Sequence, residues 1–396
     1  MNVFTLLACL LCASAAHAAD YKPARCASAV PYAGPALRSP PTAQELRVSG
    51  SIEGRLDEAT AARLSDAFER ALEASEAKSM TAAVAVAGKG MWSAERTPAG
   101  ATAAPLHYWA SAGKTLTALT VLRLVEAGRL SLDDPVGKFV EGVPNGAMIT
   151  VAMLLDHTSG LFSANEDAVV RRNRKPLTLE ETLRVLNRHG AMFCPGEQWR
   201  YTNSGYDLLG RIIEVVEGRL FAAAMTQRLL APLGLGSLRI LGPDDAAADV
   251  APPAPSDPDQ PGLDVRIPGA AGPLVARAED VVRFWHAVMD DEVVSLATRE
   301  RMVARLYPMF GSAPYYGQGV MVYDVPSTDA EKSVWIGHSG GAPGFRAILA
   351  YVARDRAFVA VALSGDGSAE ASAQLLLTAL RDARPPAAGA AYRGIR

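Results

Sequence analysis

The sequence is poor in cysteine and carries no excess of positive charge. Only four cysteines occur among 396 residues; the one CxxC pair, Cys9 and Cys12, lies in the apolar N-terminal run, and there is no HExxH run. These absences exclude a small disulfide scaffold and the common zinc sites, so we expect no metal. The 39 Lys and Arg residues against 42 Asp and Glu residues leave a net charge of -3. Because no broad basic field attracts a phosphate backbone, we expect no nucleic-acid partner.

The glycine patterns that hold nucleotides are incomplete. The segment 112–115 (AGKT) resembles the end of a phosphate-binding loop, but Tyr108 stands where that loop requires glycine. Gly234 and Gly236 begin a dinucleotide pattern whose third glycine position is Arg239. We therefore expect no cofactor.

Apolar runs long enough to span a bilayer are missing as well. The N-terminal run from Val3 to Ala16 is shorter than the roughly 20 residues that a spanning helix needs, so no transmembrane segment is expected. Residues 16–18 (AHA) have the small-x-small pattern of a secretory cleavage site. We predict a signal peptide over 1–18 and a secreted or periplasmic protein. The run is not preceded by Lys or Arg, and a lipoprotein signal at Cys9 remains the alternative.

Cleavage after residue 18 would leave two cysteines, Cys26 and Cys194. In an oxidising compartment they could pair as a disulfide, or they could remain two thiols. Their spacing alone does not decide between these states.

The apolar periodicity divides the chain into α/β ends and a helical middle. Helical spacing occurs over 57–77, 114–128, 177–188 and 204–216, and strand patterns occur over 81–87, 334–337, 345–352 and 357–364. A proline-rich segment over 251–262 reads as an exposed loop. We predict an N-terminal arm over 19–49, one domain over 50–384 and a loose tail over 385–396. Within that domain, an α/β part (about 50–107 and 275–384) holds a helical insertion (about 108–274).

Two segments offer a nucleophilic serine. Ser111 and Lys114 form an S-x-x-K pair at the start of a predicted helix, where residues three apart share a face and the N-terminus favours negative charge. Residues 337–341 (GHSGG) match the G-x-S-x-G elbow around Ser339. The elbow must lead into a helix and be followed by a histidine, whereas a strand pattern follows here and His338 is the last histidine. Ser339 stays the alternative nucleophile.

Three ordered motifs carry a family resemblance. They are residues 111–114 (SAGK), 201–203 (YTN) and 338–340 (HSG), and the strings 154–161 (LLDHTSGL) and 206–213 (YDLLGRII) lie between them. Over roughly residues 50 to 380 the chain resembles the serine β-lactamase and penicillin-binding protein superfamily, in its class C β-lactamase and D-alanyl-D-alanine carboxypeptidase branch. The resemblance implies an antiparallel sheet flanked by helices, of the β-lactamase/transpeptidase type, with a helical insertion domain.

The resemblance also implies roles for these residues. Ser111 would form an acyl-enzyme, with Lys114 and Tyr201 as acid and base in a division that stays open. A pKa near 10.4 leaves about one lysine in 2,500 neutral at pH 7, and a pKa lower by about three would bring the two forms near parity. The remaining implied groups bind substrate or form the oxyanion hole: Asn203, His338, Ser339 and Gly340 for the substrate, and the backbone N–H groups of Ser111 and Gly341 for the oxyanion.

The substrate class depends on His338, which stands where β-lactamases of this family usually carry Lys. A histidine of pKa near 6.5 is mostly neutral at pH 7, which disfavours efficient β-lactam hydrolysis. We expect a monomeric hydrolase of a D-Ala-D-Ala peptide, an ester or a D-amino-acid amide. A β-lactamase proper and a penicillin- or peptidoglycan-binding protein without turnover are the alternatives. Arg346 is either a cation for a substrate carboxylate or a solvated strand residue, and we expect a packing role for His157.

Overall fold

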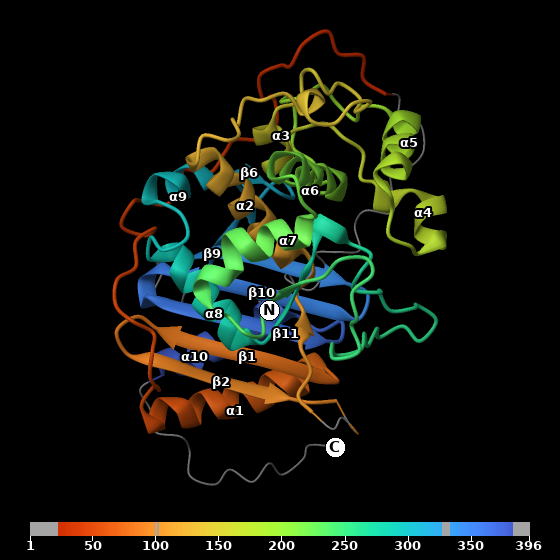
Figure 1. Cartoon of the computed structure of the whole chain (residues 1–396). Helices are drawn as coiled ribbons and strands as arrows, with labels where there is room; N and C mark the ends of the chain where they lie inside the picture. The colour runs from red at the N-terminus through yellow and green to blue at the C-terminus, as the bar shows by residue number, and fades with distance from the viewer. Residues whose placement is uncertain (1–22, 99, 101–102, 327–332, 383–396) are drawn as a thin grey trace.

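The computed structural model describes residues 23–98, 100, 103–326 and 333–382; the predicted signal peptide and the tail over 385–396 lie outside them. Its centre is a fully antiparallel sheet in the order β2-β1-β11-β10-β9-β8-β7-β6 (Figure 1). The strands are β1 (Ser79–Val86), β2 (Gly90–Arg96), β6 (Tyr307–Pro308), β7 (Tyr315–Tyr316), β8 (Met321–Val325), β9 (Ser333–Ala342), β10 (Phe345–Val352) and β11 (Ala357–Ser364). This antiparallel sheet with flanking helices confirms the predicted fold class.

Both faces of the sheet are covered, because every residue of the central strands β1 and β11 is buried. Along β1, Ala83 and Ala85 point into one core, whereas Met80 and Val84 point into the other, as the two-residue period of a strand requires. Helices α1 (Glu58–Ser75) and α10 (Ala369–Arg381) cover one face, and α8 (Ala278–Met289) packs on the other.

The helical part lies beyond one end of the sheet (Figure 1). Its helices are α2 (Lys114–Glu126), α3 (Val151–Leu155), α4 (Ala168–Asn173), α5 (Leu179–His189), α6 (Asn203–Glu217) and α7 (Phe221–Met225); α9 (Leu296–Met302) follows α8 later in the chain. Nearly every residue of α2 is buried; α6 packs against α2, and α3 packs against α6. A second sheet has the strand order β3 (His107–Tyr108), β5 (Leu274–Ala276) and β4 (Arg239–Ile240). In it, the segment before the helical part, β3, pairs with the segment after it, β5. No helix that the structure describes is long and apolar enough to cross a membrane.

The N-terminal arm ties the two parts of the molecule together. Cys26 and Cys194 form a disulfide across 168 residues of sequence, so the open question of their pairing is answered. Further along the arm, Arg38 Nη2 pairs with a carboxylate oxygen of Asp324 on β8 at 2.7 Å. The arm therefore spans from the helical part to the short-strand end of the sheet.

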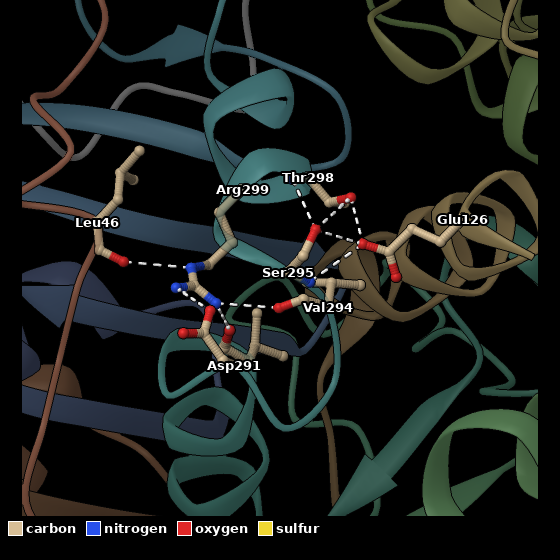
Figure 2. A network of polar contacts seen from close by, with 8 residues as sticks. Leu46, Glu126, Asp291, Val294, Ser295, Thr298 and Arg299 are labelled. Carbon is tan, nitrogen blue, oxygen red and sulfur yellow. Dashed lines mark hydrogen bonds and ion pairs between the residues drawn. The ribbon is translucent and has the colours of Figure 1, made fainter.

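A buried arginine fixes the arm to α8 and α9 (Figure 2). The side chain of Arg299 is 3% exposed and pairs with Asp291 at 2.7 Å. It donates hydrogen bonds to the backbone carbonyls of Leu46, Val288 and Val294 at 2.8–3.2 Å. Beside it, the carboxylate of Glu126, at the end of α2, accepts hydrogen bonds from the first turn of α9. The carboxyl end of α2 is thereby anchored.

Candidate active site

Ser111 lies in a tight turn that leads directly into α2. The turn is a 3-10 helix over Ala110–Gly113, and Ala110 adopts a φ of +46°. A non-glycine residue with positive φ is strained and persists only where its surroundings hold it, often at functional sites. Ala110 is buried, and the turn presents the Ser111 hydroxyl beside the first residue of α2, Lys114.

The ammonium group of Lys114 is fully buried and surrounded by three acceptors. Its Nζ lies 3.2 Å from Ser111 Oγ, 2.6 Å from Asn203 Oδ1 and 2.5 Å from the carbonyl oxygen of Ala271. An ammonium has three N–H donors, so each donor has a partner. The S-x-x-K pair and the YTN motif, 89 residues apart in sequence, meet at this one nitrogen.

Burial decides the charge of this lysine. Removal from water lowers the pKa of Lys114 to about 7, while the carboxylate of Asp207 acts in the opposite direction. Asp207 lies on α6, one turn after Asn203, and burial raises the pKa of its carboxyl group. Near neutral pH both forms of Lys114 are populated, as a general base requires.

Tyr201 lies just before α6 and covers Lys114. The Nζ atom lies 4.9 Å from the centre of the Tyr201 ring. The Tyr201 hydroxyl is buried and has no hydrogen-bond partner among the residues that the structure describes. Burial raises the pKa of Tyr201 above its usual range, opposed by the nearby Ser111 hydroxyl. Tyr201 is therefore a neutral phenol at physiological pH, and its hydroxyl lies near that of Ser111.

Asn203 is held from two sides. Its Oδ1 accepts from Lys114, and its Nδ2 donates to Asn165 Oδ1 at 3.0 Å. The hydroxyl of Ser163 accepts from the Asn203 backbone N–H at 2.9 Å and donates to Asn165 at 2.7 Å. One amide hydrogen of Asn203 thus remains for a ligand.

Strand β9 forms the opposite wall of the site. Here Gly340 packs against the Ser111 turn: a Cβ on it would lie 2.2 Å from the Trp109 carbonyl oxygen and 3.0 Å from the Ser111 backbone nitrogen. Strand β8 pairs with residues 333–337 only, so within the described strands residues 338–342 have no partner on that side. Apart from the Ser339 carbonyl, which accepts a hydrogen bond from His338, no strand that the structure describes blocks this backbone edge from an extended substrate.

The two other side chains of the HSG motif do not reach toward Ser111. The His338 ring is fully buried; its Nδ1 donates to the Ser339 carbonyl, and its Nε2 lies 3.1 Å from the Tyr316 hydroxyl. Burial lowers the pKa of His338 to about 3, so the ring is neutral. The Ser339 hydroxyl bonds to Tyr323, and β9 turns into β10 rather than into a helix. The elbow reading of Ser339 is therefore not supported.

Two other residues considered in the sequence, His157 and Arg346, have structural partners, and Trp199 packs beside the first of them. His157 is buried and neutral, and its Nδ1 accepts from the Thr202 backbone N–H at 3.3 Å, in agreement with a packing role. Trp199 packs edge-on against His157 at 6.0 Å. The cationic role considered for Arg346 finds no support, because its guanidinium pairs with Asp366 at 3.0 Å.

Three contributors escaped sequence reasoning. Tyr316 and the Ala271 carbonyl reach the site only through the tertiary fold, and no local pattern marks them. Asp207 had a signal, since it follows Asn203 by four residues and shares its helix face. Among the residues described, no cluster of three or more His, Cys, Asp or Glu could hold a metal ion.

Comparison with known proteins identifies the family. The sequence profile described as Beta-lactamase matches residues 64–383, most of the chain. The chain belongs to the beta-lactamase family. With its penicillin-binding relatives and structural neighbours, it is a member of the serine β-lactamase and penicillin-binding protein superfamily, whose members are serine hydrolases.

Curated relatives from this superfamily cover part of the chain. Penicillin-binding protein 4* of Bacillus subtilis is 30% identical over 264 residues, 61% of this chain and 56% of the relative. Penicillin-binding protein 4 of Amycolatopsis lactamdurans is 32% identical over 202 residues, 48% of this chain and 52% of the relative. The chain thus spans about half the length of these relatives.

Solved structures match a larger share of this chain than these relatives do. A D-stereospecific amidohydrolase from a Streptomyces species superposes with a TM-score of 0.66 at 25% identity, over 80% of this chain and 98% of that one. A D-amino acid amidase from Ochrobactrum anthropi has a TM-score of 0.69 at 22% identity, over 80% and 98%. At this identity, the likeness to the amidase shows a shared fold alone. A penicillin-binding protein homologue from Pyrococcus abyssi is described as octameric, so a monomer stays a prediction for this chain.

Proposed function

We propose that this protein hydrolyses small esters or amides, D-amino-acid amides first, through an acyl-enzyme on Ser111. The observation that carries the proposal is the set of atoms around Lys114 Nζ. Two of its three neighbours, the oxygens of Asn203 and Ala271, can only accept hydrogen bonds. A neutral amine would give its two hydrogens to them and keep its lone pair for the third neighbour, the Ser111 hydroxyl.

Acylation then follows from this arrangement. Lys114 takes the proton of Ser111 Oγ as that oxygen bonds to the substrate carbonyl carbon. The oxyanion is held by the backbone N–H groups of Ser111 and Gly341, each donor being typically worth about 10² to 10³ in rate. As the carbon–nitrogen or carbon–oxygen bond breaks, the leaving group takes the phenolic proton of Tyr201, which Lys114 replaces.

Deacylation reverses these roles. A water molecule gives its proton through Tyr201 to Lys114 as its oxygen attacks the ester carbonyl carbon, and Ser111 recovers a proton as the acyl–oxygen bond breaks. The raised pKa of Tyr201 supports this carrier role, because a phenol that stays neutral delivers a proton rather than storing charge.

Charge supports the choice of substrate. His338 is neutral, and Arg346 is already paired with Asp366, so neither offers a cation to a carboxylate beside β9. An ester or amide without a free carboxylate at this position suits such a wall. Two structural neighbours are titled D-stereospecific amidohydrolase and D-amino acid amidase. A D-alanyl peptidase is the second candidate, favoured by the relatives named penicillin-binding proteins.

A substrate panel with intact-mass detection tests the proposal. The protein is incubated with D-phenylalanine amide, an activated aryl ester, a D-Ala-D-Ala peptide and a penicillin, with Ser111→Ala and Ser339→Ala as matched variants. We expect turnover of the amide and ester that Ser111→Ala abolishes and Ser339→Ala retains. Release of D-alanine from the peptide, with no turnover of the amide or ester, would favour the peptidase. A stable penicillin adduct without turnover would favour a binding protein. Activity that survives Ser111→Ala would refute the site.

Export is part of the same proposal. Disulfides persist in oxidising compartments, so the Cys26–Cys194 bridge supports a secreted or periplasmic location. Expression of the full chain in a bacterium, followed by intact-mass analysis of the exported protein, should give a chain that begins at Ala19. A cytoplasmic, uncleaved product would contradict this location.

A further inference from the structure

A second pocket lies at the far end of the two helices that carry the candidate site. Lys114 and Asn203 begin α2 and α6, and the pocket lies where both helices end. Its volume is about 440 Å³, within the usual range of ligand pockets. Its lining residues come mainly from these helix ends and from the turn after α7: Arg123, Arg129, Glu217, Arg219, Gln227, Arg228 and Pro232.

The lining is strongly basic. Four arginines against one glutamate leave an excess of three positive charges. The Glu217 side chain is only 6% exposed and is ion-paired with both Arg129 and Arg228. Glu217 therefore orients two of the guanidinium groups, while the charge of the other two is not balanced by a lining acid.

Hydrogen bonds to the rest of the protein use only part of the N–H groups of these arginines. Arg123 donates to the carbonyl of Val293, and Arg129 donates to the carbonyl of Val216 near the end of α6. The first bond holds the loop between α8 and α9 and the second holds the end of α6, and both use few of the five N–H groups of each guanidinium. Arg228 Nε is buried without a hydrogen-bond partner in the described part of the chain. For Arg219, which is exposed, the described residues provide no hydrogen bond.

The backbone beside the pocket is unusual as well. Residues Thr226–Leu230 form a π-helix, a rare conformation that is frequently found at functional sites. It carries Gln227 and Arg228, both of which line the pocket. The widened turn is thus part of the wall.

We infer that this pocket binds a phosphate-bearing polyanion, held by Arg123, Arg219 and Arg228. Guanidinium groups match phosphate oxygens in pairs, and here they converge from α2, from the end of α6 and from the π-helix. Donors from three directions suit a tetrahedral oxyanion better than a planar carboxylate. The inference is independent of the proposed hydrolase activity.

Two sources share this chemistry: a soluble phosphate compound and a phospholipid headgroup. Leu220 follows Arg219 directly and is 76% exposed, so it could enter the acyl boundary of a membrane. The test therefore uses two probes, sodium pyrophosphate in solution and vesicles of phosphatidylglycerol, with phosphatidylcholine vesicles as the neutral reference.

The full chain is titrated by calorimetry with pyrophosphate in phosphate-free buffer, and vesicle binding is measured by co-sedimentation. We expect saturable binding that weakens at least tenfold in Arg219→Glu, a loss of the size expected for a charged hydrogen bond. Arg184→Glu, an equal charge change at an exposed position of α5, should bind like the wild type. Both variants should keep the wild-type esterase rate, since neither residue lies in the candidate site, and a cooperative thermal unfolding transition, since both side chains are exposed.

The two arms separate the sources. Binding of pyrophosphate that Leu220→Asn leaves unchanged supports a soluble ligand, and binding of phosphatidylglycerol vesicles alone, weakened by Leu220→Asn, supports a headgroup. Absence of saturable binding with both probes would overturn the inference. Equal binding by Arg219→Glu and Arg184→Glu would also overturn it, because attraction would then be general rather than local.

Discussion

The contact between Gly340 and the Ser111 turn gives the sharpest test of the site. In Gly340→Ala the new methyl group would lie 2.2 Å from the Trp109 carbonyl oxygen, whereas ordinary contact begins at 3.4 Å. Strand β9 and the turn would have to separate by about 1 Å, and a misplacement of that size can cost about 10²-fold in rate. Overpacking of this kind also costs about 1 to 3 kcal/mol of stability.

The assay is kcat/KM for an aryl ester, together with thermal unfolding. Gly236→Ala is the matched control, because a Cβ at Gly236 meets nothing within 4 Å and its φ is not in the left-handed region. We expect Gly340→Ala to lose about a hundredfold in kcat/KM while it still unfolds cooperatively, and the control to match the wild type. If Gly340→Ala retained activity within twofold of the control, β9 would not form a wall of the reactive site.

Four further outcomes follow from charges and bonds. The kcat/KM should rise through a midpoint near pH 7 as Lys114 loses its proton, and Asp207→Asn should move the midpoint to lower pH because it removes a neighbouring carboxylate that raises the pKa of Lys114. In urea, Arg299→Met should cost about 3 kcal/mol, since three backbone carbonyls lose a charged donor. Cys26→Ser should lower the unfolding free energy by about 2 to 5 kcal/mol, measured in the same way. Stability should fall less steeply between pH 6.5 and 5 in His338→Gln than in the wild type, by up to about 1.4 kcal/mol per pH unit.

Parts of the fold whose local sequence agrees with their final structure were predictable. Strands β10 and β11 have the predicted bounds, 345–352 and 357–364, because their apolar runs end at turn residues. Helix α2 begins at Lys114 as predicted. Strand β9 extends to residue 342, five residues beyond the prediction, because pairing with β10 holds a glycine-rich segment of low strand propensity.

The groups of the candidate site likewise fall into those that a local sequence pattern marks and those that it does not. The S-x-x-K pair and the YTN motif could be found because each is a short local pattern, and the fold brings both to Lys114. The Ala271 carbonyl could not be found, because a backbone acceptor has no sequence signature. Nor could the orientation of His338, because a motif gives the residue but not the face of the strand on which it is buried.

The buried histidines give the protein a built-in sensitivity to acid. Burial lowers the pKa of His107 to about 4 and that of His338 to about 3, and it lowers the pKa of His157 as well. On unfolding below pH 6.5 all three take up protons, so their contribution to stability is lost as the pH falls. Asp156 and Asp207 act in the opposite sense, because burial raises the pKa of each carboxyl group and the folded state binds their protons first. Three groups against two leave a net loss of stability toward pH 5. Two of the three histidines, His157 and His338, lie close enough to Lys114 for its charge to lower their pKa further.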